Sequence, residues 1–190
     1  MNPRWRTILL GAIGSTLCAC LCGQATPSQA VEVVFNLTYL VRDSGALQLD
    51  LYRPASHQGL LPAVICIADR RQQKIDSDHE TRLARSLAEK GYVAAVVNYR
   101  PIGLKPFPAQ LHDLKAAVRW LRSQAKTYGI DPHVIGAVGH AAGGHLATLL
   151  ATSGNDSRLE ENPNGPEMIS GQIQAAVVSS AQTDLGSSYF

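Results

Sequence analysis

Two glycines four residues apart, Gly139 and Gly143, enclose a candidate catalytic turn. The apolar run before Gly139 predicts a buried strand and the residues after it predict a helix, so the turn joins a strand to a helix. In enzymes with a serine nucleophile, such a turn is strained and holds its central residue above the sheet. Here the five positions are Gly139, His140, Ala141, Ala142 and Gly143. The central residue is Ala141, whose methyl group has no oxygen with which to attack a substrate.

Histidines near this turn suggest a general base or a metal ligand. His140 and His145 flank Ala141, but no carboxylate or third ligand has metal-site spacing with them. We therefore expect no metal and no cofactor. His112 and Asp113 lie on an amphipathic helix, where we interpret them as surface and capping residues rather than as an acid–base pair.

Three other groups could carry chemistry. Ser179 and Ser180 end an apolar strand, but no glycine turn and no later histidine follow them. Cys66 lies in an apolar run, which favours a buried, unreactive thiol. A mixture of acids and arginines is interpreted as a solvated surface, and its residues are Asp69, Asp76, Asp78, Glu80, Arg70 and Arg71.

The periodicity along the chain predicts the elements that position these residues. Alternating apolar residues over 31–41 and 47–51 predict an antiparallel hairpin. Short continuous apolar runs predict strands buried on both faces, at 63–68, 93–97, 134–138 and 175–178. Helical spacing predicts helices at about 82–90, 109–127 and 142–151. Strands that alternate with helices of this length predict a three-layer α/β sandwich with a mostly parallel sheet.

Residues 1–30 have the composition of a secretory signal. Two arginines precede an uncharged apolar stretch, and Ser28-Gln29-Ala30 is a small-x-small cleavage site. The stretch is shorter than the roughly 20 residues of a membrane-spanning helix. We expect export to the periplasm or the medium, with residues 31–190 as the folded domain. An alternative is a lipoprotein signal, in which Cys20 becomes the acylated N-terminus.

The composition is that of a globular domain and argues against binding of nucleic acid. The chain has 190 residues, 45% of them hydrophobic, and a formal net charge of +2, which suits one globular domain. No cluster of lysines and arginines large enough to bind a polyanion is present, so nucleic acid is not an expected partner.

Several segments, in this order, resemble the α/β-hydrolase esterases, in the branch of feruloyl and acetyl-xylan esterase-like proteins and hormone-sensitive-lipase-like carboxylesterases. They lie between about residues 36 and 186, and they are Leu49-Asp50-Leu51-Tyr52-Arg53-Pro54, Asn98-Tyr99-Arg100, Phe107-Pro108-Ala109-Gln110, the helix from Asp113 to Leu121, Tyr128-Gly129-Ile130-Asp131-Pro132, Gly139 to His145, and Thr183-Asp184-Leu185. The resemblance implies an α/β-hydrolase fold and a serine carboxylic-ester hydrolase that acts on a small ester or a glycan ester.

The sequence departs from the pattern of that family at three places. The first is Ala141, which stands where the family has its serine. The second is the segment Ala68-Asp69-Arg70-Arg71, which replaces a His-Gly-Gly-Gly-type loop whose backbone N–H groups would stabilise an oxyanion. The third is length, because the family's acid and histidine follow the seventh and eighth strands and Phe190 comes just after the sixth.

These departures predict a truncated α/β-hydrolase domain with a degenerate active site and no turnover. Two alternatives stay open, a non-catalytic protein that binds an ester or glycan ligand and a truncated gene product without function. The strand at 175–178 carries no charge, so as an exposed sheet edge it would favour self-association.

Overall fold

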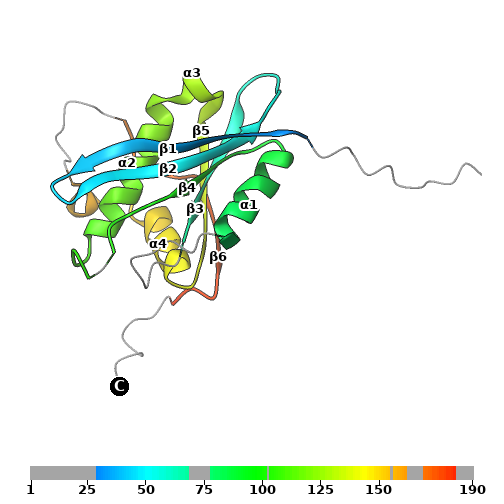
Figure 1. The fold of residues 1–190 in the computed structure, drawn as a ribbon. Coiled ribbons are helices and arrows are strands. Elements are labelled where there is room, and N and C mark those ends of the chain that lie inside the picture. Colours follow the sequence, from blue (N-terminus) through cyan, green and yellow to red (C-terminus); the bar gives the residue numbers. More distant parts are fainter. Residues whose placement is uncertain (1–28, 69–77, 102, 155, 162–168, 183–190) are drawn as a thin grey trace, which may run out of the picture.

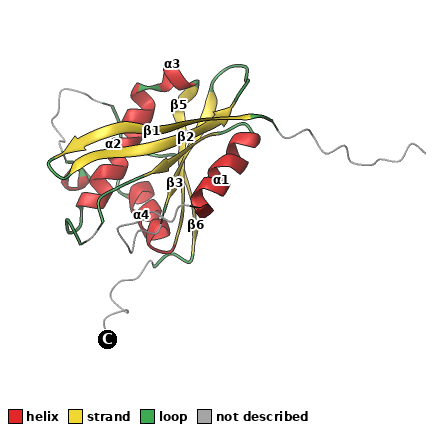
Figure 2. Cartoon of the chain, in the orientation of Figure 1, coloured by secondary structure: helices red, strands yellow, loops and turns green. Residues whose placement is uncertain are grey.

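A computed structural model describes residues 29–68, 78–101, 103–154, 156–161 and 169–182 (Figures 1 and 2). The predicted leader therefore lies outside the described residues, except for Gln29 and Ala30. All six predicted strands form, and they are β1 (Val31–Arg42), β2 (Gly45–Pro54), β3 (Leu61–Ile67), β4 (Val93–Val97), β5 (Ile130–His140) and β6 (Ala175–Ser179).

One six-stranded sheet has the order β1-β2-β4-β3-β5-β6. The hairpin of β1 and β2 joins it through an antiparallel pairing of β2 with β4. The pairings of β3 with β4, β3 with β5 and β5 with β6 are parallel. The prediction of a mostly parallel sheet led by an antiparallel hairpin is confirmed. Because the parallel strands all point the same way, their carboxyl ends meet at one edge of the sheet.

Helices cover both faces of this sheet, as the three-layer prediction requires (Figure 1). They are α1 (Asp78–Glu89), α2 (Ala109–Ser123), α3 (Ala125–Tyr128) and α4 (Ala141–Thr152), and a short 3₁₀ helix, η1 (Ser157–Leu159), follows them. The larger apolar core lies between the sheet and α2 and α4. A smaller cluster, with Cys66, Ala84 and Ala88, packs α1 on the other face. Alternation along β3 divides its side chains between these two cores.

The helix bounds differ from the predictions by more than one residue in two places. The helix predicted over 109–127 is divided at Gln124, next to Ser123, whose hydroxyl donates to the Trp120 carbonyl at 2.8 Å. Such a bond back to the preceding turn competes with the regular helical pattern. Helix α1 begins at Asp78, four residues before the predicted start, because the acids Asp78 and Glu80 in its first turn suit a helix N-terminus.

Strand β6 is the edge of the sheet within the described residues, where it pairs with β5 alone. All five of its residues are exposed, including Val177 and Val178. Self-association through this edge stays a prediction. In the described part of the chain, no helix is long and apolar enough to cross a membrane.

A buried ion pair ties the hairpin, the sheet and α2 together, and it corrects the interpretation of Asp113 as a surface residue. Asp113 is completely buried in α2. The Arg100 backbone N–H, Nε and Nη2 all donate to its carboxylate, at 2.8–3.0 Å for the shortest bond of each. Arg42 at the end of β1 lies 3.6 Å from the same carboxylate and also pairs with Glu161. The helical spacing predicts that position 113 is helical, but the partner that allows its burial, Arg100, comes from the loop after β4.

Replacing Asp113 tests the contribution of this pair. We expect Asp113→Ala to lower the free energy of unfolding by about 3–5 kcal/mol, because it leaves the largely buried Arg100 guanidinium without its carboxylate. The matched control is Asp156→Ala, which removes a carboxylate that pairs with Arg158 at 2.7 Å on the surface. Exposed pairs contribute little, so the control should change stability far less. Urea unfolding measures both, and equal effects would contradict a special role for Asp113.

Candidate functional site

The turn between β5 and α4 has the geometry of a nucleophile elbow. His140 is extended, with φ −116° and ψ 146°, and Ala141 follows at φ 50°. A residue with a β-carbon is strained in this left-handed region by about 1–2 kcal/mol. Ala141 is thus held at the tip of a sharp turn, but it offers only a methyl group.

The two glycines of the elbow are required by packing. A β-carbon on Gly139 would overlap the carbonyl oxygen of Gly143, and one on Gly143 would overlap the carbonyl oxygen of Ile67 at the end of β3. The first turn of α4 therefore lies directly against β5 and β3. This contact fixes the direction in which α4 leaves the sheet.

Of the predicted oxyanion segment, the structure describes Ala68 alone, and Asp69, Arg70 and Arg71 lie outside the described residues. Ala68 is buried, and its carbonyl accepts a hydrogen bond from the Tyr99 hydroxyl at 2.7 Å. Tyr99 thereby fixes the end of β3 from which that segment leaves. The Ala142 backbone N–H, the other oxyanion donor that the family pattern implies, belongs to the first turn of α4.

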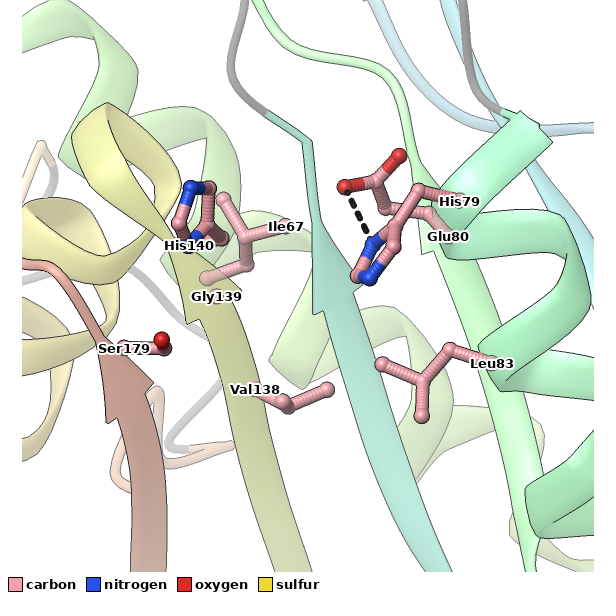
Figure 3. A pocket seen from close by; sticks show the side chains of 8 residues that line it. All are labelled: Ile67, His79, Glu80, Leu83, Val138, Gly139, His140 and Ser179. Carbon is pink, nitrogen blue, oxygen red and sulfur yellow. Dashed lines mark hydrogen bonds and ion pairs between the residues drawn. The ribbon is translucent and has the colours of Figure 1, made fainter.

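A cavity of about 120 Å³ lies beside the elbow at the carboxyl ends of β3, β5 and β6. Figure 3 shows its lining residues, which are Ile67, His79, Glu80, Leu83, Val138, Gly139, His140 and Ser179. His140 and Ser179 are register partners on adjacent parallel strands. Their side chains consequently belong to one wall, and α1 supplies the opposite wall.

The cavity corrects the interpretation of Glu80 as part of a solvated acidic surface. Glu80 is 8% exposed, and its Oε1 lies 3.4 Å from Nδ1 of His79. The sequence did hold a signal for this burial, because Glu80, Ala84 and Ala88 follow one another at intervals of four and form the buried face of α1. His79 and Leu83 were not singled out from the sequence, and no spacing marks them as lining residues.

The predicted histidines His145 and His112 do not line the cavity. His145 lies in α4, where its Nδ1 is 2.8 Å from the Gln182 carbonyl oxygen. His112 is half-buried, and burial lowers the pKa of its imidazole. Among the described residues, no group of three or more histidines, cysteines or acids is arranged to hold a metal ion.

Cys66 confirms the prediction of a buried thiol. Its side chain is fully buried on β3, and it is a free cysteine. Burial, and to a smaller extent the negative charge of Glu80, raises the pKa of this thiol to about 12. Because the thiolate is the nucleophilic form, Cys66 cannot replace the missing serine.

Comparison with known proteins gives one consistent relationship. A sequence profile of the BD-FAE family matches residues 49–189. The chain is 37% identical over 95 residues to the probable carboxylic ester hydrolase LipM of Mycobacterium tuberculosis. This alignment covers 50% of the chain and 21% of LipM. It is also 30% identical over 131 residues to an acetylxylan esterase of Xylanibacter ruminicola. That alignment covers 68% of the chain and 26% of the acetylxylan esterase.

Solved structures agree with these sequence matches. Esterase 2 of Thermogutta terrifontis superposes with a TM-score of 0.66 at 28% identity, over 82% of this chain and 57% of that one. The chain therefore spans about a quarter or less of these two curated relatives, and somewhat more than half of the solved esterase.

Adjacent alanines in the elbow allow a direct test of its strain. We expect Ala141→Gly to raise the free energy of unfolding by about 0.5–1 kcal/mol, because glycine relieves the left-handed conformation and this gain exceeds its entropic cost. Ala142→Gly removes the same methyl group from the first turn of α4, where it should instead cost about 0.5–1 kcal/mol. Thermal and urea unfolding of both variants gives the two signs. A loss of stability in Ala141→Gly would show that residue 141 is not strained.

Proposed function

The chain belongs to the BD-FAE family of α/β-hydrolase esterases, and from this relationship we propose that it descends from a serine carboxylic-ester hydrolase but does not itself hydrolyse esters at its elbow. One observation carries the proposal. Ala141 occupies the strained position at the tip of the elbow, at φ 50°, where the family motif has its serine.

The chemistry of acyl transfer explains why this single position is decisive. Hydrolysis by these enzymes begins when a hydroxyl oxygen attacks the ester carbonyl and forms an acyl intermediate. The methyl group of Ala141 cannot form that bond. Removing the serine of such a triad lowers turnover by about 10⁶, even when the surrounding site is intact. The Ala142 N–H could still polarise a carbonyl, but it supplies no nucleophile.

Binding without turnover is the second candidate function, and the cavity beside the elbow is the observation that favours it. The cavity combines an apolar side with histidines, a hydroxyl and a carboxylate, which is the composition of a small-ligand site. By analogy with the relatives, the ligand would be a small ester or an esterified glycan. A gene product without function would show neither binding nor turnover.

An esterase assay tests the loss of turnover. We expect the wild type to hydrolyse nitrophenyl acetate and butyrate at the rate of buffer alone, and Ala141→Ser to remain inactive as well. A serine hydroxyl needs a histidine to accept its proton. In the described residues, the histidine–carboxylate pair with a hydrogen bond is His79 with Glu80, and Ala141 does not line the cavity that this pair faces.

A third variant, Ala141→Ser with a grafted His-Gly-Gly-Gly loop in place of residues 68–71, separates the defects. Turnover in this variant alone would show that the oxyanion loop was the remaining obstacle. Turnover by the wild type that disappears on heating would contradict the proposal, and rescue by Ala141→Ser alone would reveal a base elsewhere in the chain.

We also propose that the protein is exported and that residues 1–30 are removed. The fold supports this, because β1 begins at Val31, immediately after the predicted cleavage site. The two residues before Val31 contact the residues just after β2, where the Ala30 carbonyl accepts from the Ala55 N–H and the Gln29 side chain donates to the Ser56 carbonyl. Cleavage would therefore leave every strand intact.

Mass spectrometry of the exported protein tests this proposal. We expect a mature N-terminus at Val31, and Ala30→Arg should block processing because the small residue at the cleavage site is lost. A diacylated N-terminus at Cys20 would favour the lipoprotein alternative. Intact Met1 on exported protein would contradict both.

A further inference from the structure

Within the described part of the chain, the Glu80 carboxylate is buried without a lysine or arginine partner. Glu80 is 8% exposed, and none of the described lysines and arginines pairs with it. Its described contact is with Nδ1 of His79, at a long 3.4 Å, and the His79 side chain is itself 68% exposed. A carboxylate removed from water with so little compensation favours any cation that can reach it.

The cavity gives a cation access to this carboxylate. In Figure 3, Glu80 and His79 lie at one side of the cavity, and His140 and Ser179 lie across from them. An imidazole nitrogen and a hydroxyl oxygen can both accept a hydrogen bond from an N–H group. A charged nitrogen in the cavity would therefore meet a carboxylate at one wall and neutral acceptors at the other.

The rest of the lining is apolar. Leu83 from α1 and Val138 from β5 form the part of the cavity away from these polar groups (Figure 3). Such a surface accommodates an alkyl chain but offers no hydrogen bond to a second charged or polar end. The ligand should thus be polar at one end only.

Size and charge restrict the ligand further. The volume of about 120 Å³ is somewhat smaller than the roughly 150 Å³ of an apolar cavity that holds benzene, so it suits a ligand of only a few non-hydrogen atoms. With histidines counted as neutral, Glu80 gives the described lining a single negative charge. We propose that the cavity binds a small primary alkylammonium ion, with its nitrogen at Glu80 and its alkyl chain against Leu83 and Val138. This inference does not depend on the proposed loss of turnover, because it requires neither a nucleophile nor an ester, and it replaces the ester of the second candidate function as the ligand of this cavity.

A matched set of ligands tests the proposal on the full chain. Propylammonium, propan-1-ol and propionate have nearly the same size and differ in charge. Ligand-observed NMR titrations at pH 8 and low salt should show binding of propylammonium and little or none of the other two. Equal binding of propan-1-ol would mean that the cavity recognises only the alkyl chain. Tighter binding of propionate would mean that the elbow binds anions instead. Either result overturns the proposal.

Two variants in one helical turn identify the group responsible. Glu80→Gln keeps the shape of the side chain and should weaken propylammonium binding by at least about tenfold, since a hydrogen bond to a charged partner is lost. Asp78→Asn removes an exposed acid from the same turn of α1 and should leave binding unchanged. Equal binding by wild type and Glu80→Gln, with both folded by circular dichroism, overturns the proposal.

The salt dependence of the wild type tests the proposal without any variant. Binding of propylammonium should weaken modestly as sodium chloride is raised, because salt screens the attraction between opposite charges, although it screens a buried pair less than an exposed one. Affinity that is independent of salt would contradict a role for the carboxylate. The ester assays measure turnover and these titrations measure binding, so failure of one proposal is distinguishable from failure of the other.

Discussion

The close approach of α4 to β3 and β5 determines the rest of this site. A β-carbon on Gly139 would overlap the carbonyl oxygen of Gly143, and a β-carbon on Gly143 would overlap the carbonyl oxygen of Ile67. With the helix held this close, the chain must turn sharply after His140, and the residue at the tip takes the left-handed conformation. The carboxyl ends of β3, β5 and β6 then meet around the cavity. A single steric constraint thus positions both the elbow and the pocket beside it.

The same constraint explains how the motif can persist without its nucleophile. Gly139 and Gly143 are needed for packing whether or not chemistry takes place, whereas this packing does not require a hydroxyl group at position 141. Family membership therefore establishes the fold and the lineage, and the function must be argued from the residues of the site. In this chain the frame fits an esterase and the residue at its tip does not.

Buried carboxylates show how packing changes the meaning of a charged residue. Asp113 is buried because Arg100, thirteen residues earlier in the loop after β4, surrounds it with three donors. Glu80 is buried on the face of α1 that packs against the sheet, and among the described residues it has one weak partner, His79. The first carboxylate stabilises the fold through its partner, and the second faces a cavity. Charge alone does not distinguish these two situations, because the difference lies in what the neighbouring elements bring to each site.

The sequence by itself determined the element types, the mixed sheet and the position of the elbow. Apolar runs and helical spacing are local properties of the sequence. The two glycines around Ala141 can likewise be recognised from their spacing in the sequence alone. Only the tertiary structure decided that Asp113 and Glu80 are buried, that His140 and Ser179 share a wall, and that the helix after Pro108 is divided at Gln124. The first three findings depend on residues that are distant in the sequence. The division at Gln124 depends on the hydrogen bond from the Ser123 hydroxyl to the Trp120 carbonyl. Burial and pocket lining are properties of the packed elements, so a pattern along one element cannot specify them.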